Sequence, residues 1–189
     1  MLQQTQVDRV IEKYKEFLKL FSTVHALAAA SQASVIHAWS GLGYNRRALY
    51  LKRAAEEIVR NHGGQFPTTI EELIRLPGIG PYTARAICAF AYNQDVCAVD
   101  TNIERIVRRW RYGKRRVAAS TVWTLAQQLV PKGKGCLWNN ALMDFGALVC
   151  TSNRPKCTES DLARFFPACA SITVSERRKK SKSPFHTTD

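Results

Sequence analysis

Asp100 is the residue of this sequence whose type and position are best suited to chemistry. It follows an apolar pair, Ala98 and Val99, in "AVDTN", where a helix is predicted to begin. The ordinary role of an Asp at such a position is to cap the helix by accepting backbone N–H groups, and we expect that role here as well. Beside a groove that binds nucleic acid, the same carboxylate can also stabilise positive charge that develops on a sugar carbon, as carboxylates do in glycoside hydrolysis.

A second stretch with chemical potential is "LPGIGPYTAR", residues 76–85, which lies between two predicted helices. The helix before it is expected to begin with a capping box formed by Thr68 and Glu71. Gly78 and Gly80 let the backbone turn and present amide groups with no Cβ in the way. The helix that follows then points its free N–H groups at an anion. These features predict a helix–hairpin–helix element that binds a DNA phosphate; an ordinary turn between packed helices is the alternative.

The sequence carries a large excess of positive charge. Its 189 residues have a formal net charge of +13, which favours polyanionic partners, nucleic acid first among them. Residues 105–116 contain seven basic residues and no acidic one, and residues 175–189 contain a second basic cluster. The second cluster is predicted to be a disordered tail, which either attracts DNA non-specifically or is simply solvated. The first is expected to reach phosphates from a helix through Arg105, Arg108, Arg109 and Arg111.

Composition limits the class of protein further. Hydrophobic residues make up 46% of the chain, enough to bury a core, so global disorder is not expected. No apolar run approaches the roughly 18 residues that a membrane span needs, and the polar start "MLQQTQVDRV" lacks the features of a signal peptide. We therefore predict a cytoplasmic protein, associated with the nucleoid if it is bacterial.

Helical patterns cover nearly the whole chain. Apolar side chains recur at three- and four-residue spacing in residues 7–21, which predicts one apolar face of an amphipathic helix. Further helices are expected at about 32–40, from 46 to Gly63, on both sides of the hairpin, from Asp100 or Thr101, and within 120–130 and 136–150. No convincing run of alternating strands is present, so the predicted fold class is all-α. Asp144, in "LMDFG", is predicted to be a buried, structural carboxylate.

Six stretches of the sequence, taken in order, resemble a known family. They are "MLQQTQVDRVI", "WSGLGYNRRALYLKRAA", "HGGQFP", "LPGIGPYTARAI", "AVDTNIERIVRR" and "NNALMDFGALVCTSNRPKC". Together they resemble the helix–hairpin–helix DNA glycosylase superfamily and, within it, A/G-specific adenine glycosylases of the MutY type. The resemblance implies a base-excision repair enzyme that extrudes adenine mispaired with guanine or 8-oxoguanine and hydrolyses its N-glycosidic bond. It also implies a monomeric protein whose partner is double-stranded DNA.

The resemblance implies a particular division of the chain as well. A six-helix barrel would cover residues 6–112 and contain the hairpin at about 68–92. A second helical lobe would cover 113–170, with a degenerate iron–sulfur loop at 150–169, and would normally be completed by an N-terminal segment that this sequence lacks. Residues 171–189 would form the basic tail.

Catalytic roles follow from the resemblance residue by residue. Asp100 falls on the position that supports the oxocarbenium-like sugar, and Asn102 falls on a position that assists it. Tyr82 stands where bifunctional relatives of the endonuclease III type carry a nucleophilic Lys. Without that amine no Schiff base can form at this position, so a monofunctional glycosylase is predicted.

The resemblance also assigns residues that contact DNA. Gln3, Gln4 and Thr5 match a motif at the DNA groove, where Gln4 would fill the space near the orphaned base. Tyr44 matches a residue that wedges into the base stack, since an aromatic face replaces stacking. A solvated helix start for Gln4 and a half-buried packing role for Tyr44 are the alternatives. The predicted contacts are completed by Gly78, Ile79, Gly80, Thr83 and Arg105.

Two departures from the family bear on activity. The family's catalytic acid is a Glu two residues before "MLQQT", and this sequence begins at that Met. We therefore expect Met1 to be an internal residue of a longer protein. We also expect adenine release by the chain as given to be severely weakened. Only the basic tail follows the loop, where long members carry a β-rich domain that helps recognise 8-oxoguanine, so we expect weak discrimination between A opposite G and A opposite 8-oxoguanine. A thymine glycosylase acting on T/G mismatches and a non-catalytic DNA-binding protein therefore stay open as alternatives.

The metal site departs from the family as well. Members hold a [4Fe–4S] cluster by four thiolates spaced C-x6-C-x2-C-x5-C. Cys150 and Cys157 keep the first spacing, but Ser160 and Phe166 occupy the other two positions and Cys169 comes late. We predict that the cluster is absent or incomplete. A zinc site lacks a paired C-x2-C or a nearby His.

Overall fold

The computed structural model describes residues 1–2, 5–113, 115–153 and 155–156. Within these ranges every regular element is a helix, which confirms the all-α class. None of the described helices is both long enough and apolar enough to cross a membrane. The helices are α1 (Val7–Leu20), α2 (Val24–Ala29), α3 (Gln32–Trp39), α4 (Arg46–His62), α5 (Ile70–Arg75), α6 (Pro81–Ala91), α7 (Thr101–Arg111), α8 (Ala119–Gln128) and α9 (Gly135–Leu148).

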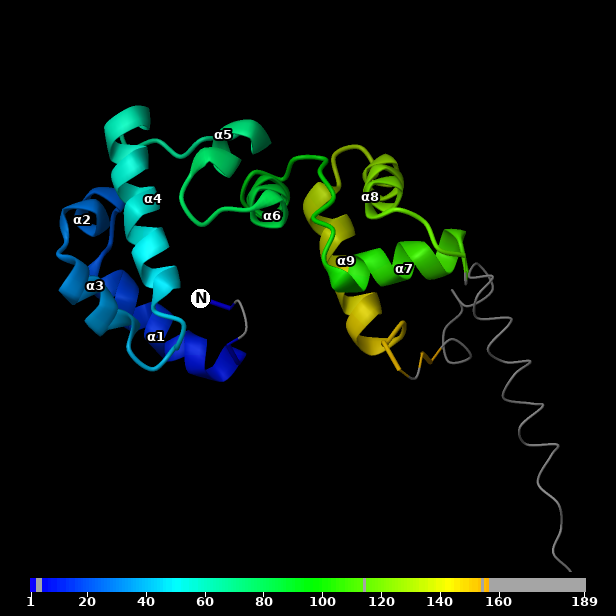
Figure 1. Cartoon of the computed structure of the whole chain (residues 1–189), viewed down its shortest axis with the longest axis horizontal. Coiled ribbons are helices and arrows are strands. Elements are labelled where there is room, and N and C mark those ends of the chain that lie inside the picture. The colour runs from blue at the N-terminus through cyan, green and yellow to red at the C-terminus, as the bar shows by residue number, and fades with distance from the viewer. Residues whose placement is uncertain (3–4, 114, 154, 157–189) are drawn as a thin grey trace, which may run out of the picture. The chain divides into compact units, whose positions relative to one another are not determined.

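The chain forms two compact units, one from Met1 to Ala84 and one that begins at Arg85 (Figure 1). Each has its own cluster of buried apolar side chains. The predicted division into a barrel at 6–112 and a lobe at 113–170 is a different partition of the chain and stays a prediction. The predicted tail at 171–189 lies outside the described residues.

Helix ends in the first unit follow from short polar side chains. Thr23 and Ser31 each accept a backbone N–H three residues ahead and so begin α2 and α3. The capping box of α5 lies one residue beyond the predicted pair, because Thr69 Oγ1 accepts the Glu72 N–H and donates to the Glu72 carboxylate. Gly63 ends α4 in the left-handed conformation, as predicted.

The core of the first unit lies among α1 to α4. Helix α4 packs against α2 and α3, and α1 packs against α3. Val35 and Ala48 are completely buried there. Lys52 is buried as well, and its ammonium group is paired with the Glu56 carboxylate and the Ala28 carbonyl oxygen. The charge is thereby stabilised at the edge of an otherwise apolar core.

The single apolar face predicted for α1 is only partly buried. Val10 and Phe17 enter the core. Val7, Ile11, Tyr14 and Leu18 are 43–59% exposed. Only a narrow stripe of the apolar side chains of α1 therefore packs in the core.

In the second unit, α7 packs against both α8 and α9. Ile103 and Val122 are fully buried between these helices. Gly146 allows the close approach of α9 to α7, because a Cβ there would lie 2.9 Å from Asn102 Cβ. Asp144 is exposed on α9, so the prediction of a buried, structural carboxylate was wrong; the buried residues of α9 are Gly135, Asn139 and Gly146.

Candidate functional site

Asp100 caps α7, as predicted. Its Oδ1 accepts the Ile103 backbone N–H at 2.7 Å, and its Oδ2 accepts a hydrogen bond from Asn102 Nδ2 at 3.0 Å. The carboxylate is partly exposed. The structure therefore brings Asp100 and Asn102 together, with both carboxylate oxygens oriented by the first turn of the helix. Such an anion can stabilise a cation that approaches from solvent.

The residues immediately before Asp100 are buried. Cys97, Ala98 and Val99 are at most 4% exposed. Burial raises the pKa of the Cys97 thiol to about 11; the positive charge of Arg85 lowers it and the negative charge of Asp100 raises it further. The thiol is consequently protonated at neutral pH and does not provide a thiolate nucleophile or metal ligand.

The backbone of this segment is bonded by two side-chain carboxamides, Gln127 of α8 and Asn139 of α9. Sequence reasoning did not single out either residue. The available signal was weak, because each is one of a polar pair within a helix that also carries apolar residues.

Arg105 and its neighbours bind protein groups in the second unit. Arg105 Nε donates to the Cys150 carbonyl oxygen at 2.8 Å, and its Nη2 donates to the Gly146 carbonyl oxygen at 2.9 Å. Arg109 donates to the carbonyl oxygens of Thr151 and Ser152. These arginines satisfy carbonyl groups at and just after the C-terminal end of α9. Contact between Arg105 and DNA stays a prediction.

The predicted metal loop is described only at its start. Cys150 is buried, and Arg109 Nη1 lies 3.4 Å from its Sγ. Cys157 and Cys169 lie outside the described residues, among which no group of three or more His, Cys, Asp or Glu side chains could hold a metal ion. The sequence from 150 to 169 contains three cysteines, whereas a [4Fe–4S] cluster usually takes four thiolates. This donor set does not match a complete cluster.

The hairpin lies between α5 and α6. Gly78 has a φ of +80°, and a Cβ there would lie 2.6 Å from Tyr50 Cβ, so both the backbone and the packing require glycine. Gly80 has no such φ, and no atom lies within 4 Å of the place that its Cβ would occupy. The Ile79 N–H donates to the Leu76 carbonyl oxygen and closes the turn.

Two further predicted residues lie at the start of α6. Tyr82 is 38% exposed, whereas Thr83 is partly buried. The two lie in the first unit with the hairpin glycines. Asp100, Asn102, Arg105 and Cys150 belong to the second unit.

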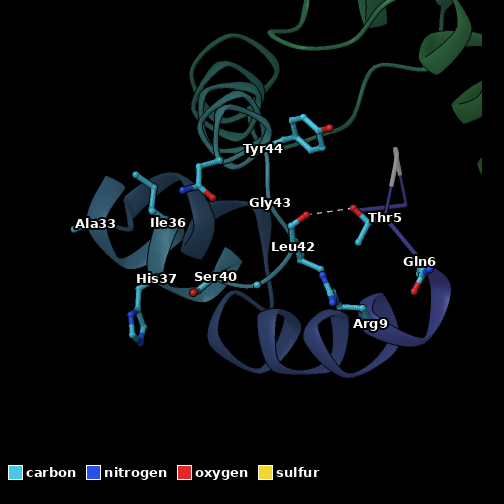
Figure 2. A pocket seen from close by; sticks show the side chains of 12 residues that line it. Thr5, Gln6, Arg9, Ala33, Ile36, His37, Ser40, Leu42, Gly43 and Tyr44 are labelled. Atoms are coloured by element: carbon cyan, nitrogen blue, oxygen red, sulfur yellow. Dashed lines mark hydrogen bonds between the residues drawn. The ribbon is translucent and has the colours of Figure 1, made fainter.

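Thr5 and Tyr44 line an open hollow of about 1110 Å³ on the first unit (Figure 2). Thr5 Oγ1 donates to the Leu42 carbonyl oxygen at 3.3 Å. Tyr44 is 67% exposed and has a φ of +50°, an uncommon conformation for a bulky residue. Gln3 and Gln4 lie outside the described residues.

Arg47 was not anticipated from the sequence, and it ties this hollow together. Its guanidinium donates to the Met1 carbonyl oxygen, to Thr5 Oγ1, and to the carbonyl oxygens of Leu42 and Gly43, all at 3.0–3.1 Å. The same group lies over the rings of Trp39 and Tyr44, at 5.4 and 5.5 Å from their centroids. One cation therefore joins Met1 and Thr5 to the loop of residues 40–44.

Residues 1–132 match the family described as "HhH-GPD superfamily base excision DNA repair protein". The chain is 41% identical over 161 residues to an adenine DNA glycosylase of Mycobacterium tuberculosis (strain CDC 1551 / Oshkosh), covering 83% of this chain and 53% of that relative. It is 40% identical over 164 residues to the adenine DNA glycosylase of Homo sapiens, covering 84% of this chain and 30% of that relative. The chain thus spans about half the length of the mycobacterial relative.

Two solved structures are similar in fold. One, described as a thermostable thymine-DNA glycosylase, has a TM-score of 0.81 and 27% identity; the match covers 90% of this chain and 80% of that one. The other, described as a non-covalent endonuclease III–DNA complex, has a TM-score of 0.78 and 21% identity; the match covers 92% of this chain and 81% of that one. The second likeness concerns the fold alone.

Proposed function

Because this chain belongs to the HhH-GPD superfamily of base excision DNA repair proteins, we propose that it acts on double-stranded DNA as a monofunctional adenine glycosylase. The substrate would be adenine mispaired with guanine or 8-oxoguanine, and the reaction would be hydrolysis of the N-glycosidic bond. The similarity to adenine glycosylases of two distant organisms supports the choice of base.

The observation that carries the proposal is the arrangement of Asp100. Its carboxylate is partly exposed and is oriented by the Ile103 N–H and by Asn102. As the bond to the base breaks, positive charge develops on the sugar, and a fixed anion lowers the energy of that charge because it needs no reorganisation. Asn102 would hold the second carboxylate oxygen towards its own helix. None of the described residues is assigned the role of the general acid.

The hairpin is proposed to position the duplex. Open space beside Gly80 would let a phosphate approach the backbone at the start of α6. Ile79 and Thr83, on either side, would complete this contact, and Arg105 would add charge elsewhere on the duplex. Such contacts place the enzyme without reading sequence.

The hollow beside Tyr44 is proposed to face the opened base pair. The exposed Tyr44 ring would stack on a base, and Thr5 would contribute its hydroxyl group at the rim. Gln3 and Gln4 are proposed to reach the orphaned base.

Strand cleavage is not part of the proposed reaction. Tyr82 has no amine, so it cannot form a Schiff base with the abasic sugar. Borohydride added during the reaction is expected to trap no covalent protein–DNA adduct; a trapped adduct would show that another amine attacks.

The test is a single-turnover assay on duplexes that carry A opposite 8-oxoguanine, A opposite guanine, or T opposite guanine. Alkali then cleaves the abasic sites, and the fragments are counted over time. Because no described residue is assigned as the general acid, we expect only slow release of adenine opposite 8-oxoguanine. If no base is released from any duplex while binding persists and weakens steeply with salt, the protein is a DNA-binding module and the proposed activity is wrong.

Thymine opposite guanine is the second candidate substrate. The observation in its favour is the thymine-DNA glycosylase structure, similar in fold at a TM-score of 0.81 and 27% identity. In the same assay, release from the T/G duplex alone would identify this activity in place of the first.

A further inference from the structure

The segment that leads to Asp100, residues 93–99, belongs to no helix, although its Gln94 N–H donates to the Cys88 carbonyl oxygen of α6 and its Val96 N–H donates to the Gln94 carbonyl oxygen. It is irregular, and its last three residues are buried. Buried backbone N–H and C=O groups need partners. Side chains from α8 and α9 provide partners for backbone groups of residues 95–98.

Asn139 of α9 is fully buried and bonds the segment on both sides of Cys97. Its Oδ1 accepts the Ala98 N–H at 2.8 Å, and its Nδ2 donates to the Val96 carbonyl oxygen at 2.7 Å. The same Nδ2 donates to the Gly135 carbonyl oxygen at 2.8 Å. Both amide hydrogens are therefore used, and the backbone two residues before Asp100 is fixed to α9.

Gln127 of α8 bonds the segment a little earlier. Its Oε1 accepts the Cys97 N–H at 3.1 Å and Arg85 Nη1 at 3.0 Å, and its Nε2 donates to the Asp95 carbonyl oxygen at 2.7 Å. The two carboxamides thus bind four consecutive residues of the segment, each through one backbone group, from two helices.

The start of α9 also lies directly against this segment. A Cβ at Gly135 would overlap the carbonyl oxygen of Gln94. The Gly133 N–H donates to the Asp95 carboxylate at 2.8 Å. No larger residue fits at position 135 unless the segment moves.

We propose that Asn139 and Gln127 are positioning residues for Asp100, an inference that rests on the proposed glycosylase function. They act through the backbone: they hold residues 95–98, and these set where the Asp100 carboxylate stands. A carboxamide carries no net charge, so it fixes the backbone without adding an ion beside the carboxylate. Misplacement of a catalytic group by about 1 Å costs on the order of a hundredfold in rate.

The first variant is Asn139→Leu, which keeps the branched shape of the side chain, adds some volume and removes three hydrogen bonds. Asn140→Leu is the matched control, because Asn140 is exposed on the same helix and, within the described part of the chain, its side chain bonds only to Cys136 Sγ. In single turnover on the A/8-oxoguanine duplex, we expect the rate constant of Asn139→Leu to fall roughly tenfold to a hundredfold. Its DNA dissociation constant should change less than about twofold, and the control should match the parent chain.

The amplitude of the same reaction separates positioning from mere stability. A purely structural role would lower the fraction of active molecules and leave the rate constant of those molecules unchanged. That result would overturn the inference.

Gln127→Met is the second variant, useful if Asn139→Leu fails to fold. It keeps the length of the side chain and removes the bonds to Cys97, Arg85 and Asp95. Gln128→Met, at an exposed neighbour, is its control. We expect a rate constant lower by about threefold to tenfold for Gln127→Met alone. Equal rates for the two variants would contradict the proposal.

Hydrogen–deuterium exchange gives a readout that needs no activity. In Asn139→Leu, amides 96–103 should exchange faster, while those in the rest of the second unit keep their protection. An even loss across α7 to α9, or no change, would overturn the inference. If the parent chain releases no base from any duplex, the proposed function fails, and exchange alone then decides whether the carboxamides hold this segment.

Discussion

Two irregular segments carry residues assigned to the reaction, and they are held by different kinds of side chain. The segment before Asp100 is buried and bonded by the neutral carboxamides of Asn139 and Gln127. The loop that ends at Tyr44 is largely exposed and bonded by one guanidinium, that of Arg47. The carboxamides add no net charge of their own beside the carboxylate, whereas the charge of the partly buried Arg47 is balanced by carbonyl oxygens and by the rings of Trp39 and Tyr44. Both segments are thus held by side-chain hydrogen bonds, and they differ in the exposure of the backbone and in the charge of the side chain that holds it.

The largest effect expected from this comparison is that of Asp100→Asn. The rate of base release should fall on the order of a hundredfold to a thousandfold, because the variant removes the fixed negative charge. Stability should change by less than about 0.5 kcal/mol, since Asn caps helices as well as Asp does. Single-turnover kinetics and thermal unfolding check the two halves. An unchanged rate would remove Asp100 from the mechanism.

Arg47→Met tests the loop side of the comparison. It removes the bonds to Met1, Thr5, Leu42 and Gly43 while keeping an apolar stem. We expect the free energy of unfolding to fall by about 2–3 kcal/mol, measured by urea denaturation.

Arg46→Met is the control for that measurement. The guanidinium of Arg46 stacks on the Tyr50 ring, 5.3 Å from its centroid, so a loss of about 0.5 kcal/mol is expected. A loss as large as that of Arg47→Met would show that the bonds to the loop contribute little.

Cys97 tests whether the segment before Asp100 excludes water. Its pKa is raised to about 11, from 9.0 for an unperturbed thiol. Below pH 9 the Cys97 thiol is protonated in both the folded and the unfolded chain, so its full contribution to the free energy of unfolding is present. Between pH 9 and 11 the unfolded chain binds fewer protons than the folded one, so the free energy of unfolding falls as pH rises, by up to about 1.4 kcal/mol per unit.

Denaturation of the parent chain and of Cys97→Ala across this range measures the effect. The variant should show a shallower decline. If the free energies of unfolding of the two proteins fell in parallel with pH, the thiol would have the same pKa in the folded and the unfolded chain.

Tyr44→Gly should have the smallest effect on stability, within about 0.5 kcal/mol. Glycine relieves the positive φ, and this gain offsets the lost contact with Arg47 and the greater freedom of the unfolded chain. DNA affinity should nevertheless fall by about fivefold, since one stacking ring is lost. Fluorescence titration with a mismatched duplex measures this, and an unchanged dissociation constant would place Tyr44 outside the interface.

Much of the fold was accessible from local patterns. The all-α class, the stop at Gly63, the turn at Gly78 and the cap at Asp100 each depend on residues close in sequence. The α5 cap was misplaced by one residue because Thr68 and Thr69 offer equivalent side chains. The contacts of Arg47 and Asn139 join residues more than 40 positions apart, and no spacing rule reports such pairs. Asp144 was misjudged because its apolar neighbours do not all face the core.

The hydrogen bonds of Asn139 also bear on the order of assembly. The cap at Asp100 closes over three residues, so α7 can begin as soon as that part of the chain is free. The bonds that Asn139 makes to the preceding segment span 41 and 43 residues, and closing a long loop is slower than forming a helix turn. During synthesis, the carboxylate would acquire its final place only after α9 has left the ribosome, so a nascent chain that stops short of α9 would contain α7 without a finished site.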